Sequence, residues 1–350
     1  MRRILIIRPS ALGDVVMASP MIGVIRRAYP QGYLAWLVEP AAAELLRRHP
    51  GLDEVIEWPR GRWEELLRGG RVLALSGEIC RFASLLRSRS FHLALEGTGL
   101  LKGRFLAFLS GAPERIGFRS QEPGEFLMTR LISRDPADGR IGSEYLQLMD
   151  TLGLPADPFR MEVPLAAAAG DGARRLLLAQ GITGPYAVLC PFTTRNQKHW
   201  PEECWATLAM AVEKDFGLTV VVLGGLGDRI KSKRLRETTP GRMIDLTGRT
   251  TLSESAAVLA GASLVIGVDT GLTHMGVAFE RSTVALFGAT RPYLDAGTPR
   301  ARVLYHPYPC SPCRRRPTCE GRFPCMHAIE TDEVLRAVRS LLDRTNSSGR

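Results

Sequence analysis

An aspartate, a threonine, a glycine and a histidine stand close together in the segment Val268-Asp269-Thr270-Gly271-Leu272-Thr273-His274. The apolar run before it, residues 262–267, is typical of a buried parallel strand, and the small residues after it can begin a helix. Open α/β sheets bind ligands at the carboxyl ends of their strands. The first N–H groups of a helix attract an anion, and Gly271 lets the backbone approach one closely. The segment therefore predicts a cradle for the diphosphate of a nucleotide sugar.

A second acid, Asp14, closes the segment Ser10-Ala11-Leu12-Gly13-Asp14, where the first predicted strand gives way to a helix. A carboxylate at that edge can act as a general base toward a hydroxyl group. Gly13 favours this interpretation because it permits a tight turn or the close approach of a ligand. The alternative is that Asp14 only stabilises the helix N-terminus, where carboxylates are common.

Thr193, Thr194 and Lys198 lie in a loop that follows one predicted strand and precedes a predicted helix. Hydroxyls, a lysine and backbone N–H groups in one loop suit a phosphate. Lys198 could also neutralise charge on a departing diphosphate. The alternative is a polar loop that caps the helix beginning near Pro201.

Two further loops are weaker candidates. The glycines of segment 223–227 follow a predicted strand, and Asp228 beside them is placed like an acid that binds ribose. Because Gly-Gly-x-Gly lacks the full Gly-x-Gly-x-x-Gly fingerprint, a nucleotide sugar is favoured over a hydride-transfer cofactor. The loop 245–253, which contains Thr250, can line a nucleotide pocket through its backbone or form a plain turn before a helix.

The chain holds seven cysteines, and four of them stand close together near the C-terminus. These four are Cys310, Cys313, Cys319 and Cys325. In a chain without an export signal, the cluster predicts a structural zinc or another thiolate site, with reduced loop thiols or a disulfide as alternatives. The arginines 314–316 inside it suit an acidic acceptor or a membrane surface, or form a solvated basic loop. Cys80, Cys190 and Cys204 are expected to be small buried residues.

The whole chain carries a net charge of +10, from 46 lysines and arginines against 36 aspartates and glutamates. The excess is spread over both halves and forms no basic stripe, so nucleic acid is not the expected partner. An anionic substrate or an anionic membrane surface fits a diffuse positive charge. No apolar run approaches the ~20 residues of a transmembrane helix, and charged residues interrupt the first apolar segment before it could act as an export signal. We therefore expect a cytoplasmic protein.

Predicted strands and helices alternate along the chain, which favours parallel, doubly wound sheets. A proline-rich stretch at 155–164 predicts a linker, after which the pattern restarts. We expect an α/β architecture of two Rossmann-like domains facing a central cleft, residues 1–160 and 161–330, with a helix and tail at 331–350. The expected strands are 3–8, 33–38, 91–95, 186–190, 218–223, 263–267 and 283–287. The expected helices are 14–28, 40–48, 100–109, 202–216, 253–260 and 331–342.

Together these motifs resemble those of the ADP-heptose:lipopolysaccharide heptosyltransferases, a family of inverting glycosyltransferases with the GT-B fold. The resemblance covers nearly the whole chain and keeps the order of the motifs. The matching segments are 4–14, 193–194, 198–201, 269–274 and 286–290. The resemblance implies an acceptor-binding first domain, an ADP-sugar-binding second domain and catalysis without a metal, so any zinc would be structural.

The resemblance also implies a role for each candidate residue. Asp14 would be the general base and Lys198 would stabilise the departing ADP. The donor, ADP-heptose, would be bound by Thr193, Thr194, Lys198, Asp228, Thr250, Asp269, Thr270, Gly271, Leu272 and His274. The acceptor, Kdo or a first heptose on lipid A, would be bound by Ser10, Gly13, Arg62, Arg104 and Arg119.

A lipid-borne acceptor implies peripheral contact with the cytoplasmic face of the inner membrane. Two alternatives stay open. One is a relative that transfers another nucleotide-activated sugar to a different glycan, and the other is a non-catalytic nucleotide-binding protein.

Overall fold

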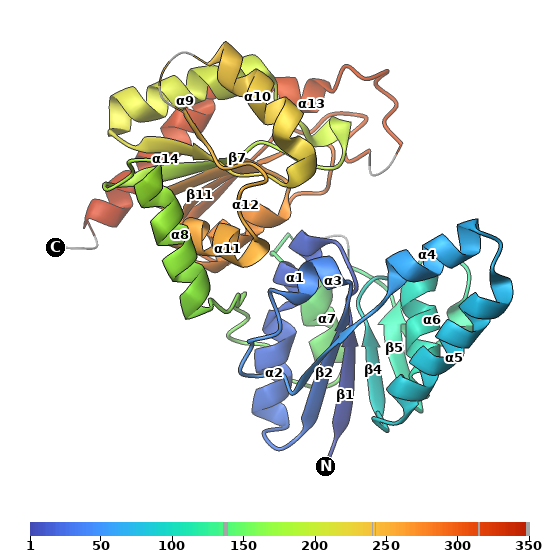
Figure 1. Ribbon diagram of the computed structural model, residues 1–350. Helices are drawn as coiled ribbons and strands as arrows, with labels where there is room; N and C mark the ends of the chain where they lie inside the picture. Colours follow the sequence, from blue (N-terminus) through green and yellow to red (C-terminus); the bar gives the residue numbers. More distant parts are fainter. Residues whose placement is uncertain (136–138, 240, 242, 314–315, 348–350) are drawn as a thin grey trace. The chain divides into compact units, whose positions relative to one another are not determined.

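The computed structural model describes residues 1–135, 139–239, 241, 243–313 and 316–347. The chain forms two compact units (Figure 1). The first consists of Met1–Asp138 with Gly142–Pro164, and the second of Gly139–Ile141 with Leu165–Arg350. No helix of the described residues is long and apolar enough to cross a membrane.

The first unit is built on a six-stranded parallel sheet with the order β3-β2-β1-β4-β5-β6. Its strands are β1 (Arg3–Ile7), β2 (Tyr33–Val38), β3 (Glu54–Glu57), β4 (Leu93–Glu96), β5 (Glu114–Phe118) and β6 (Arg130–Ile132). The register places Ile6 of β1 beside Trp36 on one side and Leu95 on the other. The strand order reverses between β1 and β4, and ligands of open α/β sheets bind at such a switch point.

Helices cover both faces of this sheet because its strands are apolar on both sides. Ile4 and Ile6 of β1 belong to the core cluster on one face, while Leu5 and Ile7 belong to the cluster on the other. The helices are α1 (Leu12–Ala18), α2 (Pro20–Ala28), α3 (Pro40–Ala43), α4 (Arg60–Arg68), α5 (Val72–Arg87), α6 (Leu101–Leu109) and α7 (Ser143–Thr151), with a short η1 (Glu125–Leu127).

The second unit repeats this plan with the strand order β12-β11-β10-β7-β8-β9, again parallel throughout. Its strands are β7 (Tyr186–Cys190), β8 (Thr219–Val222), β9 (Met243–Asp245), β10 (Leu264–Val268), β11 (Ser282–Phe287) and β12 (Ala301–Tyr305). The order reverses between β7 and β10, which gives the second unit a switch point of its own.

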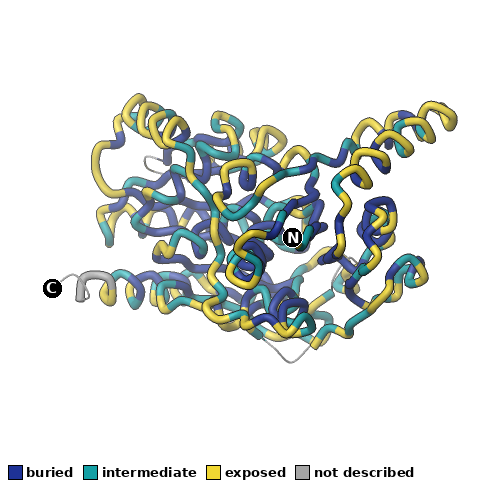
Figure 2. The backbone as a smooth tube through the Cα atoms, turned by 90° about the horizontal axis from the view of Figure 1, so that it is seen from below, coloured by how far each residue is buried: buried dark blue, intermediate teal, exposed yellow. Residues whose placement is uncertain are grey.

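The helices of the second unit are α8 (Ala167–Ala179), α9 (Glu202–Phe216), α10 (Arg229–Thr238), α11 (Leu252–Gly261), α12 (Gly271–Ala278), α13 (Pro324–His327) and α14 (Thr331–Ser347), with short η2 (Asn196–Lys198) and η3 (Leu226–Asp228). The last helix, α14, packs against β11 and α9 and contributes Val334, Val338 and Leu341 to the core. It is therefore part of the second unit. Figure 2 shows exposed residues along the outward turns of the helices and buried residues along the segments between them.

The alternation of strands and helices predicted from the sequence is confirmed, with local corrections. The single helix expected at 14–28 is two helices, because Pro20 begins α2 and has no N–H to continue the hydrogen bonding of α1. The helix expected at 40–48 ends at Ala43, and turns follow it. Helices α4, α5, α7, α8, α10 and α13 and strands β3, β5, β6, β9 and β12 were not predicted.

Candidate functional site

Asp14 lies in the first turn of α1, just beyond β1 at the switch point of the first sheet. Its Oδ2 atom lies 2.5 Å from a guanidinium nitrogen of Arg8 and accepts a hydrogen bond from the N–H of Ala11 at 3.1 Å. The second contact caps the helix, so Asp14 also does what the alternative interpretation proposed. Because 33% of the side chain is exposed, the carboxylate can still meet a hydroxyl group of a ligand.

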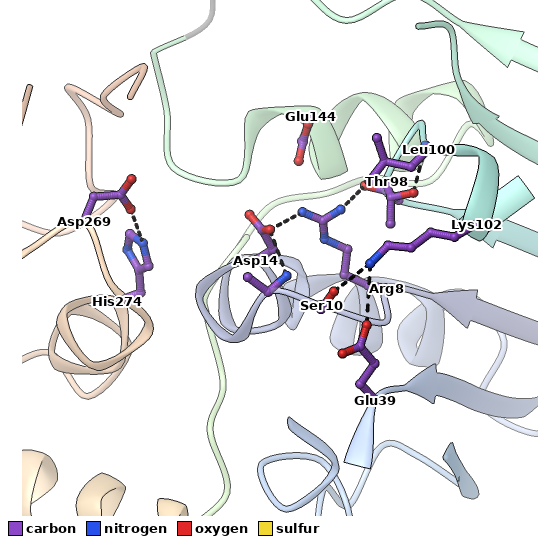
Figure 3. A network of polar contacts seen from close by, with 12 residues as sticks. Arg8, Ser10, Asp14, Glu39, Thr98, Leu100, Lys102, Glu144, Asp269 and His274 are labelled. Carbon is purple, nitrogen blue, oxygen red and sulfur yellow. Dashed lines mark hydrogen bonds and ion pairs between the residues drawn. The ribbon is translucent and has the colours of Figure 1, made fainter. Parts of the chain in front are cut away.

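Arg8, which directly follows β1, fixes the position of that carboxylate (Figure 3). Its side chain is buried, and its Nη1 donates to the carbonyl of Gly97 at the end of β4 at 3.0 Å. Burial alone would lower the pKa of Arg8, but the charge of Asp14, together with the smaller contributions of Tyr145, Glu144 and Glu96, outweighs burial and raises the pKa above its ordinary value. Arg8 therefore stays charged and ties Asp14 to both strands of the switch point.

Lys102 lies on α6, the helix that follows β4, and its side chain extends to the same edge of the sheet (Figure 3). Its Nζ donates to the hydroxyl of Ser10 at 3.0 Å and lies 3.5 Å from a carboxylate oxygen of Glu39. Burial lowers the pKa of Lys102, and Glu39 offsets this only in part. Ser10, a predicted acceptor ligand, thus stands beside a partly buried cation at which an anionic group could bind.

Among the other predicted acceptor residues, Arg104 requires a correction. It is fully buried, and its guanidinium donates to the carbonyls of Phe118, Glu122 and Pro123 and to the hydroxyl of Ser120. Arg104 holds the loop after β5 in place and is not available to a ligand. The sequence could not show this, because the residue type alone does not distinguish an arginine that becomes buried from one that stays accessible to a ligand.

The fold does not bury the other predicted acceptor residues, Gly13, Arg62 and Arg119, as it buries Arg104. Gly13 lies within α1 beside Asp14. Arg119 is exposed directly after β5, at the carboxyl edge of the sheet. Arg62 is exposed on α4 and pairs with Glu65. Their roles stay predictions.

In the second unit, Asp269 follows β10 at the switch point and lies at the centre of a polar cluster. Its Oδ2 accepts from Lys198 Nζ at 2.5 Å and from Thr290 Oγ1 at 2.6 Å, and its Oδ1 lies 3.2 Å from His274 Nε2. Burial raises the pKa of Asp269, but the hydrogen bond from His274 and the charge of Lys198 outweigh burial and lower it well below its usual range. The carboxylate is therefore charged and fully engaged, and it positions Lys198 and His274.

His274 is buried and contacts Asp269 on one side and the hydroxyl of Tyr293 on the other, with 3.0 Å between its Nδ1 and that oxygen (Figure 3 shows the aspartate contact). Burial, with the charge of Asp269, raises the pKa of Tyr293, so the phenol stays protonated and can donate to Nδ1.

The helix α12 begins at Gly271 with Thr270 as its N-cap residue, and no side chain caps it. Its first N–H groups have no partners within the helix, so this end suits an anion. Leu272 and Thr273 belong to the first turn, where Thr273 donates to the carbonyl of Val268. The structure thus brings predicted residues 269–274 and Lys198 together at one edge.

The remaining predicted donor residues lie on neighbouring loops after β7, β8 and β9. The carbonyl of Thr193 lies 3.1 Å from His199 Nε2, and Thr194 is exposed. The carboxylate of Asp228 accepts from the N–H of Gly225 at 2.9 Å, so it shapes its own loop. Thr250 shares a hydrogen bond with Ser255 at 2.7 Å. Contact of these residues with a donor stays a prediction.

The four cysteines near the C-terminus were the predicted ligands of a structural zinc. In the part of the chain that the structure describes, no three His, Cys, Asp or Glu side chains could hold a metal ion together. Cys310, Cys313, Cys319 and Cys325 are free thiols, and burial raises the pKa of Cys313 and of Cys325. Arg314 and Arg315 lie outside the described residues. The expectation for Cys80 is wrong, because that residue is exposed on α5.

Sequence reasoning gave no role to four residues of these clusters, which are Lys102, Tyr293 and two residues inside the matching segments 4–14 and 286–290, Arg8 and Thr290. Arg8 directly follows β1 and Thr290 lies three residues beyond β11, whereas Lys102 is the second residue of the helix after β4. Polar residues just after a parallel strand were therefore the available signal for Arg8 and Thr290. Tyr293 carried no such signal, since only the folded chain brings it to His274.

Two domains, each built on a doubly wound parallel sheet, are the architecture of the GT-B fold, which two solved heptosyltransferase structures share with TM-scores of 0.76 and 0.71. The predicted fold class is thereby confirmed. The sequence model of glycosyltransferase family 9 (heptosyltransferase) matches residues 79–323. The chain belongs to this family and is a glycosyltransferase.

Three relatives illustrate the similarity. Lipopolysaccharide heptosyltransferase 1 of Pseudomonas aeruginosa is 31% identical over 327 residues, which cover 91% of this chain and 87% of the relative. Lipopolysaccharide heptosyltransferase 2 of Escherichia coli is 24% identical over 357 residues, 97% of this chain and 98% of the relative. The structure of Escherichia coli heptosyltransferase WaaC with ADP-2-deoxy-2-fluoro heptose has a TM-score of 0.71 at 23% identity, covering 97% of this chain and 99% of the other.

Proposed function

We propose that this glycosyltransferase transfers heptose from ADP-heptose to the inner core of lipopolysaccharide. The observation that carries the proposal is the 31% identity to a lipopolysaccharide heptosyltransferase over 91% of the chain. It is supported by the placement of a partly exposed carboxylate at one switch point and of a lysine and a helix N-terminus at the other. A non-catalytic nucleotide-binding protein would need no base in the first unit.

In the proposed reaction, Asp14 accepts the proton of an acceptor hydroxyl as its oxygen attacks the anomeric carbon of heptose. The new carbon–oxygen bond forms as the bond to the diphosphate breaks, and ADP leaves from the opposite face. The configuration at that carbon is inverted, as in inverting hydrolases in which water takes the place of the acceptor. Arg8 holds Asp14 and thereby lowers the entropy cost of aligning the base.

The departing ADP gains negative charge on its diphosphate. Lys198, held by Asp269, and the N-terminus of α12 are placed to stabilise that charge. Asp269 pairs with Lys198, and this pair keeps the ammonium group of Lys198 in place before the donor binds. We expect no cofactor in this step, so transfer should persist when a chelator is present.

The acceptor in the proposal is Kdo or a first heptose on lipid A. Identity is higher to the relative named heptosyltransferase 1, at 31%, than to the one named heptosyltransferase 2, at 24%. We therefore propose that Kdo is the acceptor. The presence of lipid A further implies peripheral contact with the cytoplasmic face of the inner membrane.

The test is transfer from ADP-heptose to two purified acceptors, one ending in Kdo and one carrying the first heptose, with the products weighed by mass spectrometry. A gain of one heptose on the Kdo acceptor alone would support the proposal in full. A gain on the other acceptor alone would keep heptose transfer and overturn the choice of acceptor. No gain on either, with ADP still bound, would show that another sugar or glycan is the substrate.

A further inference from the structure

The turn that joins α4 and α5 exposes apolar side chains that the fold does not use. Leu67 is 62% exposed, Val72 59% and Leu73 91%. Figure 1 shows these two helices at the outer edge of the first unit. Three large apolar side chains exposed within seven consecutive residues form a patch of the kind that marks an interaction site, whereas single exposed apolar residues are common on any protein surface. We define residues 66–77 as the α4–α5 tip.

The hairpin itself is fixed to the first unit by its other side chains. Trp63 of α4 and Phe82 of α5 are buried and meet edge to face, with 5.6 Å between their ring centres. Leu66 and Leu86 are fully buried, and Leu86 belongs to the core cluster on that face of the sheet. The exposed leucines and valine can therefore be changed without opening this core.

The charge around the tip favours an anionic partner. Residues 60–90 hold seven arginines and three glutamates, and the tip itself holds Arg68 and Arg71 and no acid. Arg68 pairs with Glu64 at 3.3 Å and Arg71 with Glu65 at 2.9 Å, but the four side chains are 40–79% exposed. Exposed ion pairs of this kind contribute little, so the arginines can turn to phosphates instead.

We infer that the α4–α5 tip is the surface with which this protein contacts an anionic lipid bilayer. Leucine and valine enter the boundary between headgroups and acyl chains, and arginine binds lipid phosphate. A stable protein partner would need about 800 Å² on each side, far more than three side chains around a glycine-rich turn provide. The inference rests on the proposed function only in that a lipid-borne acceptor gives such a surface its use.

Two tip variants and one matched control test this inference. Leu67→Gln/Leu73→Gln removes the apolar contact, and Arg68→Gln/Arg71→Gln removes the charge. Ile230→Gln is the control, because Ile230 is 85% exposed on α10 among lysines and arginines but lies in the second unit. The full chain is sedimented with vesicles of phosphatidylcholine, with and without roughly one third phosphatidylglycerol.

We expect the wild-type chain and Ile230→Gln to sediment equally with the anionic vesicles. Leu67→Gln/Leu73→Gln should bind them at least about tenfold more weakly, since burying even one leucine contributes roughly that factor. Arg68→Gln/Arg71→Gln should also bind at least about tenfold more weakly, since each arginine near an anionic surface contributes about 1 kcal/mol. All four proteins should transfer heptose equally to a deacylated, water-soluble acceptor, while the tip variants fall behind on acceptor in vesicles.

Three outcomes would overturn the inference. The tip variants could bind vesicles like the wild type, Ile230→Gln could lose as much binding as they do, or the wild type could fail to bind and form a dimer through the tip instead. If the wild type transfers heptose to neither acceptor, the proposed function fails, whereas the vesicle measurement still decides the inference.

Discussion

Asp269→Asn should destabilise the second unit, because the carboxylate of Asp269 is the charged partner of a largely enclosed Lys198. The wild-type carboxylate accepts from Lys198, Thr290 and His274 within 3.2 Å, and about 15% of either charged side chain is exposed. An amide keeps one acceptor oxygen and loses the charge. Removing one partner of a buried pair costs about 3–5 kcal/mol, and the residual exposure reduces this to about 2–3 kcal/mol.

The assay is thermal unfolding followed by circular dichroism. For a unit of this size, 2–3 kcal/mol corresponds to a decrease in Tm of roughly 4–12 °C. Tyr293→Phe is the matched control, because it removes one neutral hydrogen bond to His274 and should cost only about 1 kcal/mol. Lys198→Met combined with Asp269→Asn should be less destabilising than the sum of the single changes by at least about 1 kcal/mol, since no unpaired charge remains.

The effect of Asp269→Asn should also depend on pH. The pKa of Asp269 is far lower in the folded chain than in the unfolded one, so its contribution to stability is complete above the unfolded value and is lost as pH falls. The difference in free energy of unfolding between wild type and variant should therefore shrink below about pH 5. A variant that melts within 1 °C of the wild type at neutral pH, or a difference that grows on acidification, would refute the reasoning.

Two further predictions concern the first unit. Arg8→Gln should lower kcat about 10²-fold because Asp14 loses the partner that fixes it, and Arg8→Lys should recover part of the rate. Steady-state kinetics on the Kdo acceptor measure both variants, and a kcat of Arg8→Gln equal to that of the wild type would contradict the prediction. Gly103→Ala should lower the free energy of unfolding by about 1–3 kcal/mol, since a Cβ there would lie 2.1 Å from a carboxylate oxygen of Glu96. Gly77→Ala should raise it by about 0.5–1 kcal/mol, since a Cβ at that position of α5 meets nothing within 4 Å. Denaturant unfolding of both variants decides, and changes of equal sign would contradict this prediction.

The parts of the fold that could be predicted are those with a continuous apolar signal. Strands such as β7 and β10 are buried on both faces, so their sequences are apolar throughout. Helix α4 was missed because only Trp63 and Leu66 face inward among charged residues, which leaves almost no periodic pattern. Strand β6 was missed because it is three residues long at the edge of its sheet.

The candidate site was predictable to a similar degree and for a related reason. Asp14, Lys198 and Asp269 all follow strands, and the topology brings such residues to a switch point. Pairwise contacts were not predictable, because the Lys198–Asp269 pair joins residues 71 positions apart. The burial of Arg104 was equally hidden, since it depends on a loop that folds over the guanidinium.

The most direct test of the central claim is the rate of heptose transfer by Asp14→Asn beside the wild type, measured with ADP-heptose and the Kdo acceptor. Calorimetric ADP binding and thermal unfolding confirm that the variant is folded and still binds the nucleotide. Loss of a general base predicts a fall in kcat of about 10²–10⁴-fold with ADP affinity unchanged. A folded variant that transfers heptose within tenfold of the wild-type rate would contradict the assignment of Asp14 as the base.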